Sequence, residues 1–241
     1  MLTAKTAYQN AAKIDWAFDY DISFLFEVPT QTITSLLPRL VHPYEIRPGV
    51  SLLAFGFHQF EPGNLEGALP KFTEANCGIL VQPRLSAGMP PPRFAIYVLY
   101  ISSSEKGFVK HAASVDKMPV YEASNLQWTI SADGQRVEVW DDLGPMFNLQ
   151  NTQPDPVYTA GDFYAQIFSM PTGDHLYHTQ IRWQGILSEN QHKGRGFGKV
   201  YNHPSLKGLE IDEDNQVCYM QMFTAAKAPG NLTFWTPKRI Y

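Results

Sequence analysis

Many short β-prone segments, separated by turn residues, follow one another along this chain. Clear examples are Ile22–Val28, Val50–Phe57, Phe72–Val81 and Phe94–Ile101. Val50–Phe57, with the sequence VSLLAFGF, is apolar at nearly every position, which is typical of a strand buried on both faces. Helical patterns do not alternate regularly with these segments, and this argues against a parallel α/β fold.

Two predicted hairpins favour an antiparallel arrangement. The dipeptide Asp133–Gly134 lies between the alternating segments Leu126–Ile130 and Arg136–Trp140, which is a strong hairpin signal. The turn sequence PTGD separates Phe163–Met170 from His175–Trp183 in the same way. The sequence therefore predicts a mainly β, antiparallel fold with a minor α component.

Only short helices are expected. Thr30–Pro38 begins with a threonine suited to an N-cap and is ended by its proline, while Ser102–Ala113 has the start residues and the length of a short helix. Residues 1–18 are interpreted as an N-terminal arm. Because the chain contains no internal repeat and no low-complexity segment, we expect a single domain over residues 1–241.

The composition excludes several classes of protein. A formal net charge of -4 and a pI of about 6.0 do not provide the basic surface that nucleic-acid binding requires. The longest apolar run, Phe94–Ile101, is far shorter than the roughly 20 residues that span a bilayer. The first residues lack the apolar core of a signal peptide, and Cys77 and Cys218 are interpreted as free thiols. We therefore expect a cytoplasmic protein with no nucleic-acid partner and no membrane partner.

The stretch Ala112–Ile130, AASVDKMPVYEASNLQWTI, is predicted to contain an active-site strand. Successive side chains of a strand point to opposite faces. In this stretch one face is expected to hold Met118, Val120 and Glu122, and the other Lys117 and Tyr121.

The order of motifs along the chain resembles that of the acetoacetate decarboxylase-like superfamily. The strand-to-helix segment FEVPTQTITSLLP (Phe26–Pro38) and the strand FTEANCGI (Phe72–Ile79) come first. They are followed by SVDKMPVYEA (Ser114–Ala123), the hairpin Phe163–Ile181 and the glycine-rich run to a His-Pro pair at Gly194–Pro204. The resemblance covers nearly the whole chain.

This resemblance implies an antiparallel β-barrel or cone with an apolar cavity, a homo-oligomer, and no cofactor. Members of the family use a lysine that forms a Schiff base with a β-keto acid, and the pKa of that lysine is lowered by a neighbouring lysine; acetoacetate decarboxylase is the standard example of such a desolvated, charge-perturbed nucleophile. The expected partner is therefore a small-molecule carbonyl substrate, and the expected activity is that of a lyase.

The family's Pro-Lys-Lys run can be aligned here in two registers. In the first, Lys117 takes the position of the nucleophile, with Asp116 in place of the proline and Met118 in place of the second lysine. In the second, Pro119 takes the position of the proline, and the two lysines become Val120–Tyr121. The second register is favoured because a proline fixes the local geometry of the backbone.

Other polar positions complete the predicted site. Glu74 matches an active-site glutamate of the family, and Glu122 would pair with it as acid and base if both faced one apolar cavity. Met118 and Val120 are expected to line the substrate site, and Arg195, in the glycine-rich segment, to attract an anionic substrate.

Three histidines are further candidates for a functional role. His58 is interpreted as a core histidine in preference to a proton shuttle. His175 and His178 resemble a metal pair, but residues three apart on a strand face opposite ways, so no metal site is expected.

Two functions follow from these residues. The first is an acetoacetate decarboxylase-like lyase of secondary metabolism, acting by decarboxylation, dehydration or cyclisation, with either Lys117 or the two glutamates in the catalytic role. The alternative is a non-catalytic small-molecule-binding protein on the same scaffold.

Overall fold

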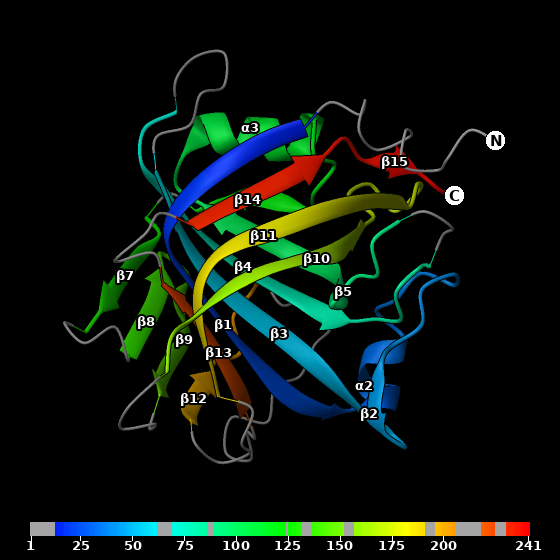
Figure 1. The fold of residues 1–241 in the computed structure, drawn as a ribbon, viewed down its shortest axis with the longest axis horizontal. Helices are drawn as coiled ribbons and strands as arrows, with labels where there is room; N and C mark the ends of the chain where they lie inside the picture. Colours follow the sequence, from blue (N-terminus) through cyan, green and yellow to red (C-terminus); the bar gives the residue numbers. More distant parts are fainter. Residues whose placement is uncertain are drawn as a thin grey trace.

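The computed structural model describes residues 13–61, 69–85, 89–123, 125–131, 136–151, 157–190, 196–205, 218–224 and 230–241. Most of these residues belong to strands (Figure 1). The larger sheet has eleven strands. These are β1 (Lys13–Pro29), β2 (Glu45–Arg47), β3 (Val50–Phe60), β4 (Phe72–Leu80), β5 (Phe94–Ser103), β6 (Val120–Glu122), β10 (Thr159–Ser169), β11 (Tyr177–Asn190), β13 (Cys218–Thr224), β14 (Gly230–Trp235) and β15 (Lys238–Arg239).

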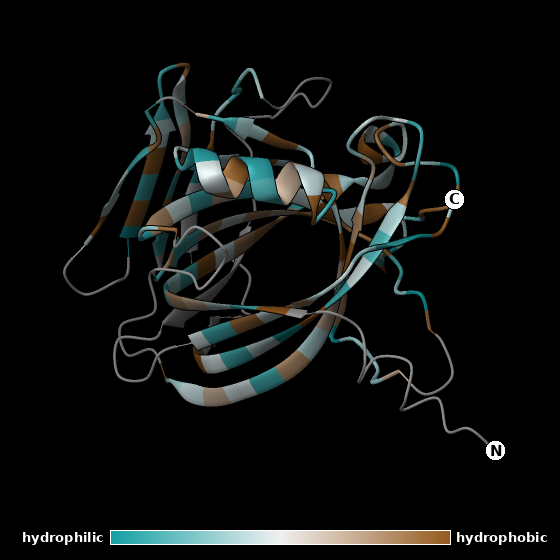
Figure 2. Ribbon diagram, turned by 90° about the horizontal axis from the view of Figure 1, so that it is seen from above, coloured by the Kyte–Doolittle hydropathy of each residue, from teal (hydrophilic) through white to brown (hydrophobic). Residues whose placement is uncertain are grey.

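The long strand β1 closes this sheet on itself. Its first part pairs with β14, its second part pairs with β13, and its opposite edge pairs with β3. The strands β1, β14, β11, β10, β5, β4 and β3 therefore form a closed ring, which appears in Figure 2 as a strongly curved sheet. The predicted β-barrel is confirmed, and so is its mainly antiparallel character. Two pairs, β10 with β5 and β5 with β6, are parallel.

A second, four-stranded sheet packs against the outside of the ring. It consists of β7 (Gln127–Ile130), β8 (Arg136–Asp141), β9 (Gly144–Asn151) and β12 (Gly196–Val200). Phe147 of β9 lies 5.1 Å from Phe24 of β1, measured between ring centroids, and Phe24 stacks on Phe55 of β3 at 5.4 Å. This outer core explains why the β3 sequence is apolar at nearly every position: one face of β3 meets the second sheet and the other faces the inside of the ring.

Both predicted hairpins are present. β7 pairs antiparallel with β8, and β10 pairs antiparallel with β11 over eleven residue pairs from Thr159 to Ser169. The Asp133–Gly134 turn itself lies outside the described residues.

Two helices occur in the described part of the chain, α2 (Thr30–Thr34) and α3 (Lys106–Ser114). Neither is long and apolar enough to span a membrane. The helix α3 begins at Glu105, whose side chain accepts a hydrogen bond from the Gly107 backbone N–H. Thr30 is the first residue of α2, not its N-cap.

Two expectations about element boundaries were wrong. The segment 13–18, assigned to an N-terminal arm, is the start of β1, because it pairs with β14 at the other end of the chain. The strand alternation predicted from Lys117 to Glu122 begins too early: Ala112–Ser114 ends α3, and within Ala112–Ile130 only Val120–Glu122 and Gln127–Ile130 form strands.

Candidate active site

The ring of strands encloses a cavity of about 320 Å³. Side chains from β1, β3, β4, β5, β10, β11 and β14 line it, together with α3 and the segment after that helix. Most of the lining is aromatic or aliphatic. The described polar side chains are therefore confined to a few positions, and their arrangement determines what the cavity can bind or transform.

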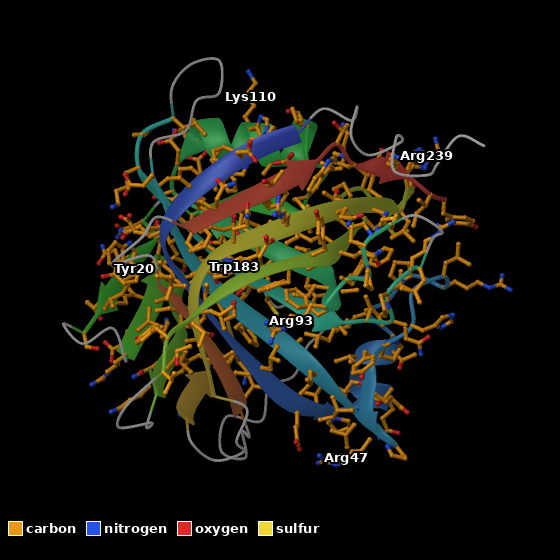
Figure 3. The ribbon with its side chains drawn as sticks, viewed as in Figure 1. Tyr20, Arg47, Arg93, Lys110, Trp183 and Arg239 are labelled. Carbon is orange, nitrogen blue, oxygen red and sulfur yellow. The ribbon has the colours of Figure 1, made fainter. Side chains whose placement is uncertain are left out.

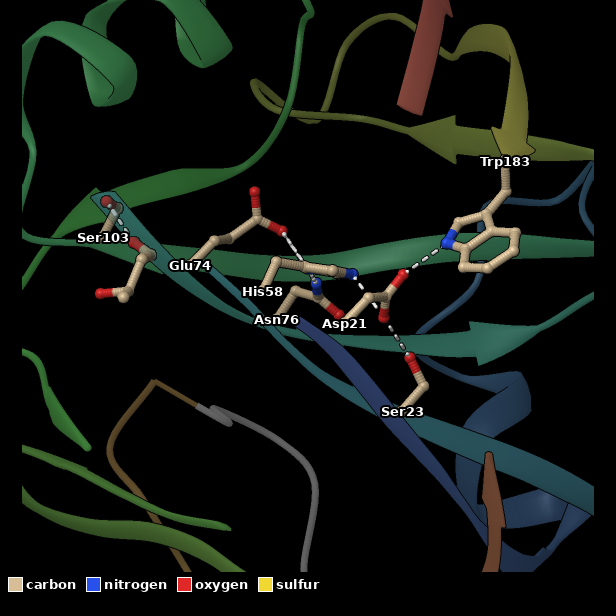
Figure 4. Close-up of polar contacts among 8 residues, drawn as sticks. Asp21, Ser23, His58, Glu74, Asn76, Ser103 and Trp183 are labelled. Atoms are coloured by element: carbon tan, nitrogen blue, oxygen red, sulfur yellow. Dashed lines mark hydrogen bonds and ion pairs between the residues drawn. The ribbon is translucent and has the colours of Figure 1, made fainter. Parts of the chain in front are cut away.

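Three charged side chains stand in a row across neighbouring strands on the cavity face. Asp21 of β1 is the cross-strand partner of His58 of β3, and His58 is the cross-strand partner of Glu74 of β4. His58 Nε2 lies 3.1 Å from Asp21 Oδ1, and His58 Nδ1 lies 3.4 Å from Glu74 Oε1 (Figure 4). All three residues line the cavity. An imidazole is thus held between two carboxylates in a largely apolar environment.

The two carboxylates are fixed by neutral donors. The Trp183 indole N–H donates to Asp21 Oδ2 at 2.9 Å, and the Ser23 hydroxyl donates to Asp21 Oδ1 at 3.3 Å. Asn76 donates from Nδ2 to Glu74 Oε1 at 2.8 Å. Glu74 Oε2 has no hydrogen-bond partner among the described residues. One oxygen of Glu74 is therefore anchored while the other remains available.

Glycines make room for these donors. A Cβ atom at Gly56 would lie 2.7 Å from Asn76 Oδ1, so a larger residue at this position of β3 would displace the amide. A Cβ atom at Gly161 or Gly185 would come within 3 Å of the Trp183 indole ring. The absence of side chains at these positions lets the indole and the amide reach the carboxylates.

The two carboxylates determine the protonation of His58. Burial alone lowers the pKa of His58, but the charge and hydrogen bond of Asp21, followed by those of Glu74, outweigh burial and raise this pKa to about 10. Asn76 Nδ2 also lies 3.1 Å from His58 Nδ1, and an amide can donate to this nitrogen only when the nitrogen carries no proton. When His58 Nδ1 carries a proton, it can donate that proton to Glu74. When it carries none, it can accept a hydrogen bond from Asn76.

Comparison with known proteins identifies the scaffold. No protein-family model matches the sequence, and no curated protein matches it. Among solved structures, an acetoacetate decarboxylase is 11% identical with a TM-score of 0.62, covering 100% of this chain and 95% of that chain. The acetoacetate decarboxylase from Legionella pneumophila is also 11% identical, with a TM-score of 0.63, covering 95% of this chain and 87% of that chain. The chain has the acetoacetate decarboxylase fold.

A third similar structure is the enduracididine biosynthesis enzyme MppR, complexed with the condensation product of pyruvate and imidazole 4-carboxaldehyde. It is 11% identical, with a TM-score of 0.58, and the match covers 97% of this chain and 91% of that chain. The resemblance derived from the motifs is thus confirmed at the level of the acetoacetate decarboxylase fold.

On this fold, Lys117 does not line the cavity. Its ammonium group donates to the Ser114 carbonyl oxygen at 2.5 Å, which turns the side chain back toward the end of α3. Its backbone has a φ of +56°, a left-handed conformation that is uncommon for a residue with a side chain. Lys117 therefore forms the turn between Asp116 and Met118, and both of these neighbours line the cavity.

The expected pairing of Glu74 with Glu122 is not formed. The side chain of Glu122 is 43% exposed and lies 3.4 Å from the Lys106 ammonium group, outside the cavity. The expectation was wrong because it extended one strand alternation from Met118 to Glu122, whereas β6 begins only at Val120, after the turn at Lys117.

The remaining predicted positions differ in their placement. Met118 is buried and lines the cavity. Val120 packs against the apolar residues around the cavity but is not part of its lining, so the inward face predicted for it is not formed. Arg195 lies outside the described residues.

Most of the polar cluster is not predicted by the sequence. His58 is expected there as a core histidine, and no site role is expected for Asp21, Asn76 or Trp183. The available signal was weak: polar residues alternate at Asp21 and Ser23, and again at Glu74 and Asn76, which places each pair on one face of its strand. Nothing in the sequence shows that these faces meet.

A second buried histidine network lies outside the cavity. His203 Nε2 is 2.9 Å from Asp141 Oδ1, His203 Nδ1 is 2.6 Å from the Ser205 hydroxyl, and the Tyr121 hydroxyl donates to Asp141 Oδ2 at 2.9 Å. The side chains of His203 and Asp141 are only 1% and 2% exposed. This Asp-His-Ser chain fixes the segment after β12 to β6 and β8.

Among the described residues, no group of three His, Cys, Asp or Glu side chains is arranged to hold a metal ion. His178 of the HxxH pair is buried, and its Nε2 has no described hydrogen-bond partner. Burial, followed by the charges of Arg84 and Lys238, lowers the pKa of His178 to about 4.

Proposed function

We propose that this protein is an enzyme that acts by proton transfer on a small carbonyl compound bound in the cavity. The arrangement of Glu74 carries this proposal. Its Oε1 is fixed by Asn76 and faces His58, while its Oε2 has no described partner in a site that is otherwise mainly apolar. A carboxylate with one anchored and one available oxygen is suited to act as a general base.

In this proposal Glu74 removes a proton from the carbon next to the carbonyl group. His58, with its raised pKa, remains protonated at neutral pH and offsets part of the negative charge of Glu74 and Asp21. The enolate formed can then expel a hydroxyl group, accept a proton at another carbon, or attack a second carbonyl group of the same molecule. In each case Glu74 returns its proton: to the departing hydroxyl group, which leaves as water, to the other carbon, or to the oxygen of the attacked carbonyl group. These outcomes correspond to dehydration, isomerisation and cyclisation.

An imine mechanism on Lys117 has less support. A Schiff-base lysine must reach the substrate, but Lys117 bonds to Ser114 outside the cavity, and no described residue of the lining is a lysine. The neighbour MppR, an enzyme of enduracididine biosynthesis, was captured with a product of pyruvate condensation. That observation favours a carbonyl substrate and a role in secondary metabolism for the present protein.

Hydrogen–deuterium exchange tests the proposal directly. The protein is incubated in D₂O with a panel of simple ketones and keto acids, and loss of the proton next to the carbonyl group is followed by NMR. We expect exchange or turnover with the wild-type protein and with Lys117→Ala, and a loss of at least 100-fold with Glu74→Gln, as is typical when a general base is removed.

The control experiment traps an imine. If the protein uses a lysine, incubation with a keto acid and borohydride adds mass to that lysine, and Lys117→Ala abolishes both the adduct and the activity. That result would reject the carboxylate mechanism in favour of the imine mechanism.

The alternative is a non-catalytic binding protein, which the largely apolar lining of the cavity also supports. It predicts saturable binding of apolar carbonyl compounds without proton exchange for any of them. In either case we expect a homo-oligomer, and light scattering of the purified chain measures this independently.

A further inference from the structure

The described charged groups of the cavity are mainly acidic. Asp21, Glu74 and Asp116 line it, and each is less than 10% exposed. The cationic groups of the lining are His58, which is already held between the first two of these carboxylates, and Arg93. Arg93, which directly precedes β5, is exposed (Figure 3). Its guanidinium carbon lies 5.0 Å from the centroid of the Phe163 ring. The interior therefore has an excess of negative charge.

Asp116 is the carboxylate that the protein itself leaves least satisfied. Its side chain is 9% exposed, and it forms an ion pair with His111, whose Nε2 lies 3.6 Å from Asp116 Oδ2, too far for a hydrogen bond. His111 Nε2 likewise has no hydrogen-bond partner. A buried carboxylate that accepts no hydrogen bond from the described residues, and whose ion pair with His111 is this long, is poorly compensated, so a positively charged group in the cavity would stabilise it.

Aromatic rings surround the same part of the cavity. Trp16 lies 6.0 Å from both Phe60 and Phe108, measured between ring centroids, and it lies 6.0 Å from His111. Trp16, Phe60 and Phe108 all line the cavity. The faces of aromatic rings attract cations, most strongly where water is excluded. Because Asp116 lines the same cavity as these rings, a charged group bound there has two kinds of favourable interaction available to it.

We infer that the cavity binds an organic cation, a small molecule in which a protonated amine or a similar charged nitrogen pairs with Asp116. The inference deepens the proposed function, because it names the class of the substrate on which Glu74 would act. A keto acid anion has the opposite charge. It would lie close to three buried carboxylates, and the described lining offers it no buried cation that is not already paired.

Binding of three probes of similar shape tests the inference. The fluorescence of the full chain, in which Trp16 and Trp183 line the cavity, is titrated with 2-phenylethylammonium, 2-phenylethanol and 3-phenylpropanoate at pH 7. We expect the cation to bind at least 10-fold more tightly than the neutral alcohol and the anion to bind more weakly than both. Equal or tighter binding of the alcohol or the anion overturns the inference, as does a lack of saturable binding of the cation at millimolar concentrations.

Matched variants assign the effect to Asp116. Asp116→Asn should weaken binding of the cation about 10-fold and leave binding of the alcohol within 2-fold, whereas Glu122→Gln removes the same charge outside the cavity and should change neither. If Asp116 serves only to pair with His111, Asp116→Asn and His111→Ala lower Tm equally and leave the preference for the cation intact, which would overturn the inference.

The readout is binding, so it is separate from the test of the proposed function. If the cation is not preferred but Glu74→Gln still abolishes proton exchange, only the inference fails. If the cation is preferred but no exchange is found, only the proposed function fails.

Discussion

His58 Nε2 lies 3.1 Å from Asp21 Oδ1 inside the cavity, and the two residues stand directly opposite each other on β3 and β1. The side chain of Asp21 is only 5% exposed and that of His58 is 14% exposed. The pair is therefore a buried ion pair whose partners depend on each other, since the loss of one leaves the other charged group in an apolar environment.

Asp21→Asn is expected to lower the pKa of His58, because Asp21 is the larger of the two favourable influences on the protonated ring. Breaking a buried pair by removing one partner should also cost about 3 kcal/mol of the free energy of unfolding. NMR titration of the His58 ring protons and urea denaturation measure the two effects. An unchanged His58 pKa in the folded variant would contradict the assignment of Asp21 as its main partner.

The raised pKa of His58 also predicts an alkaline loss of stability. The folded-state pKa of about 10 lies above the ordinary value of 6.5, so the protonated ring stabilises the folded state fully below pH 6.5, and this contribution is lost as the pH rises toward 10. The free energy of unfolding should therefore fall between pH 7 and pH 9.5 by a few kcal/mol, on the order expected for a shift of this size. The same measurement on His58→Gln should show a clearly smaller decrease.

His178 predicts a loss of stability at the acidic end. Its folded-state pKa of about 4 lies below the ordinary value of 6.5. As the pH falls from 6.5 toward 4, His178 therefore binds a proton in the unfolded chain but not in the folded chain, which favours unfolding. This should cost up to about 3 kcal/mol at pH 4. His178→Gln should flatten the stability profile between pH 6.5 and pH 5. A profile that is as steep in the variant as in the wild type would show that another group dominates.

Substitutions of Lys117 test the backbone strain at this turn independently of any catalytic role of the lysine. Its φ of +56° favours glycine, and a left-handed residue with a side chain costs about 1 kcal/mol. Lys117→Gly should therefore keep or slightly raise Tm, whereas Lys117→Ala keeps the strained backbone and should show no gain. Differential scanning calorimetry measures both variants, and a large loss of stability in Lys117→Gly would contradict this role of the turn.

The sequence was informative where the determining interactions are local. The apolar run of β3, the β10–β11 hairpin and the start of α3 depend on neighbouring residues, and they were predicted within a few positions. The closure of the ring depends on β1 pairing with β14, more than 200 residues later in the chain. No local pattern specifies such a pairing without the family resemblance.

The candidate site likewise combines features that local sequence predicts with features that depend on long-range strand pairing. Glu74 could be proposed from its motif, but its partners could not, since they depend on the register of β1 against β3 and of β3 against β4. A shift of one residue in either register would turn Asp21 or Glu74 away from His58. The turn at Lys117 was missed for a different reason: strand alternation assumes an extended backbone, and a single left-handed residue ends it.

Gly56 tests whether Asn76 positions the proposed base. A methyl group at this position would lie 2.7 Å from Asn76 Oδ1, and the amide can move away because it is the end of a side chain. Gly56→Ala should therefore cost little stability but should disturb the hydrogen bond from Asn76 to Glu74 Oε1. The rate of proton exchange should fall about 10-fold, which corresponds to roughly 1.4 kcal/mol.

Asn76→Ala should cause a similar decrease, and the double variant should be no worse than either single variant because both act through one contact. Fully additive decreases would show that Gly56 acts on the site by another route.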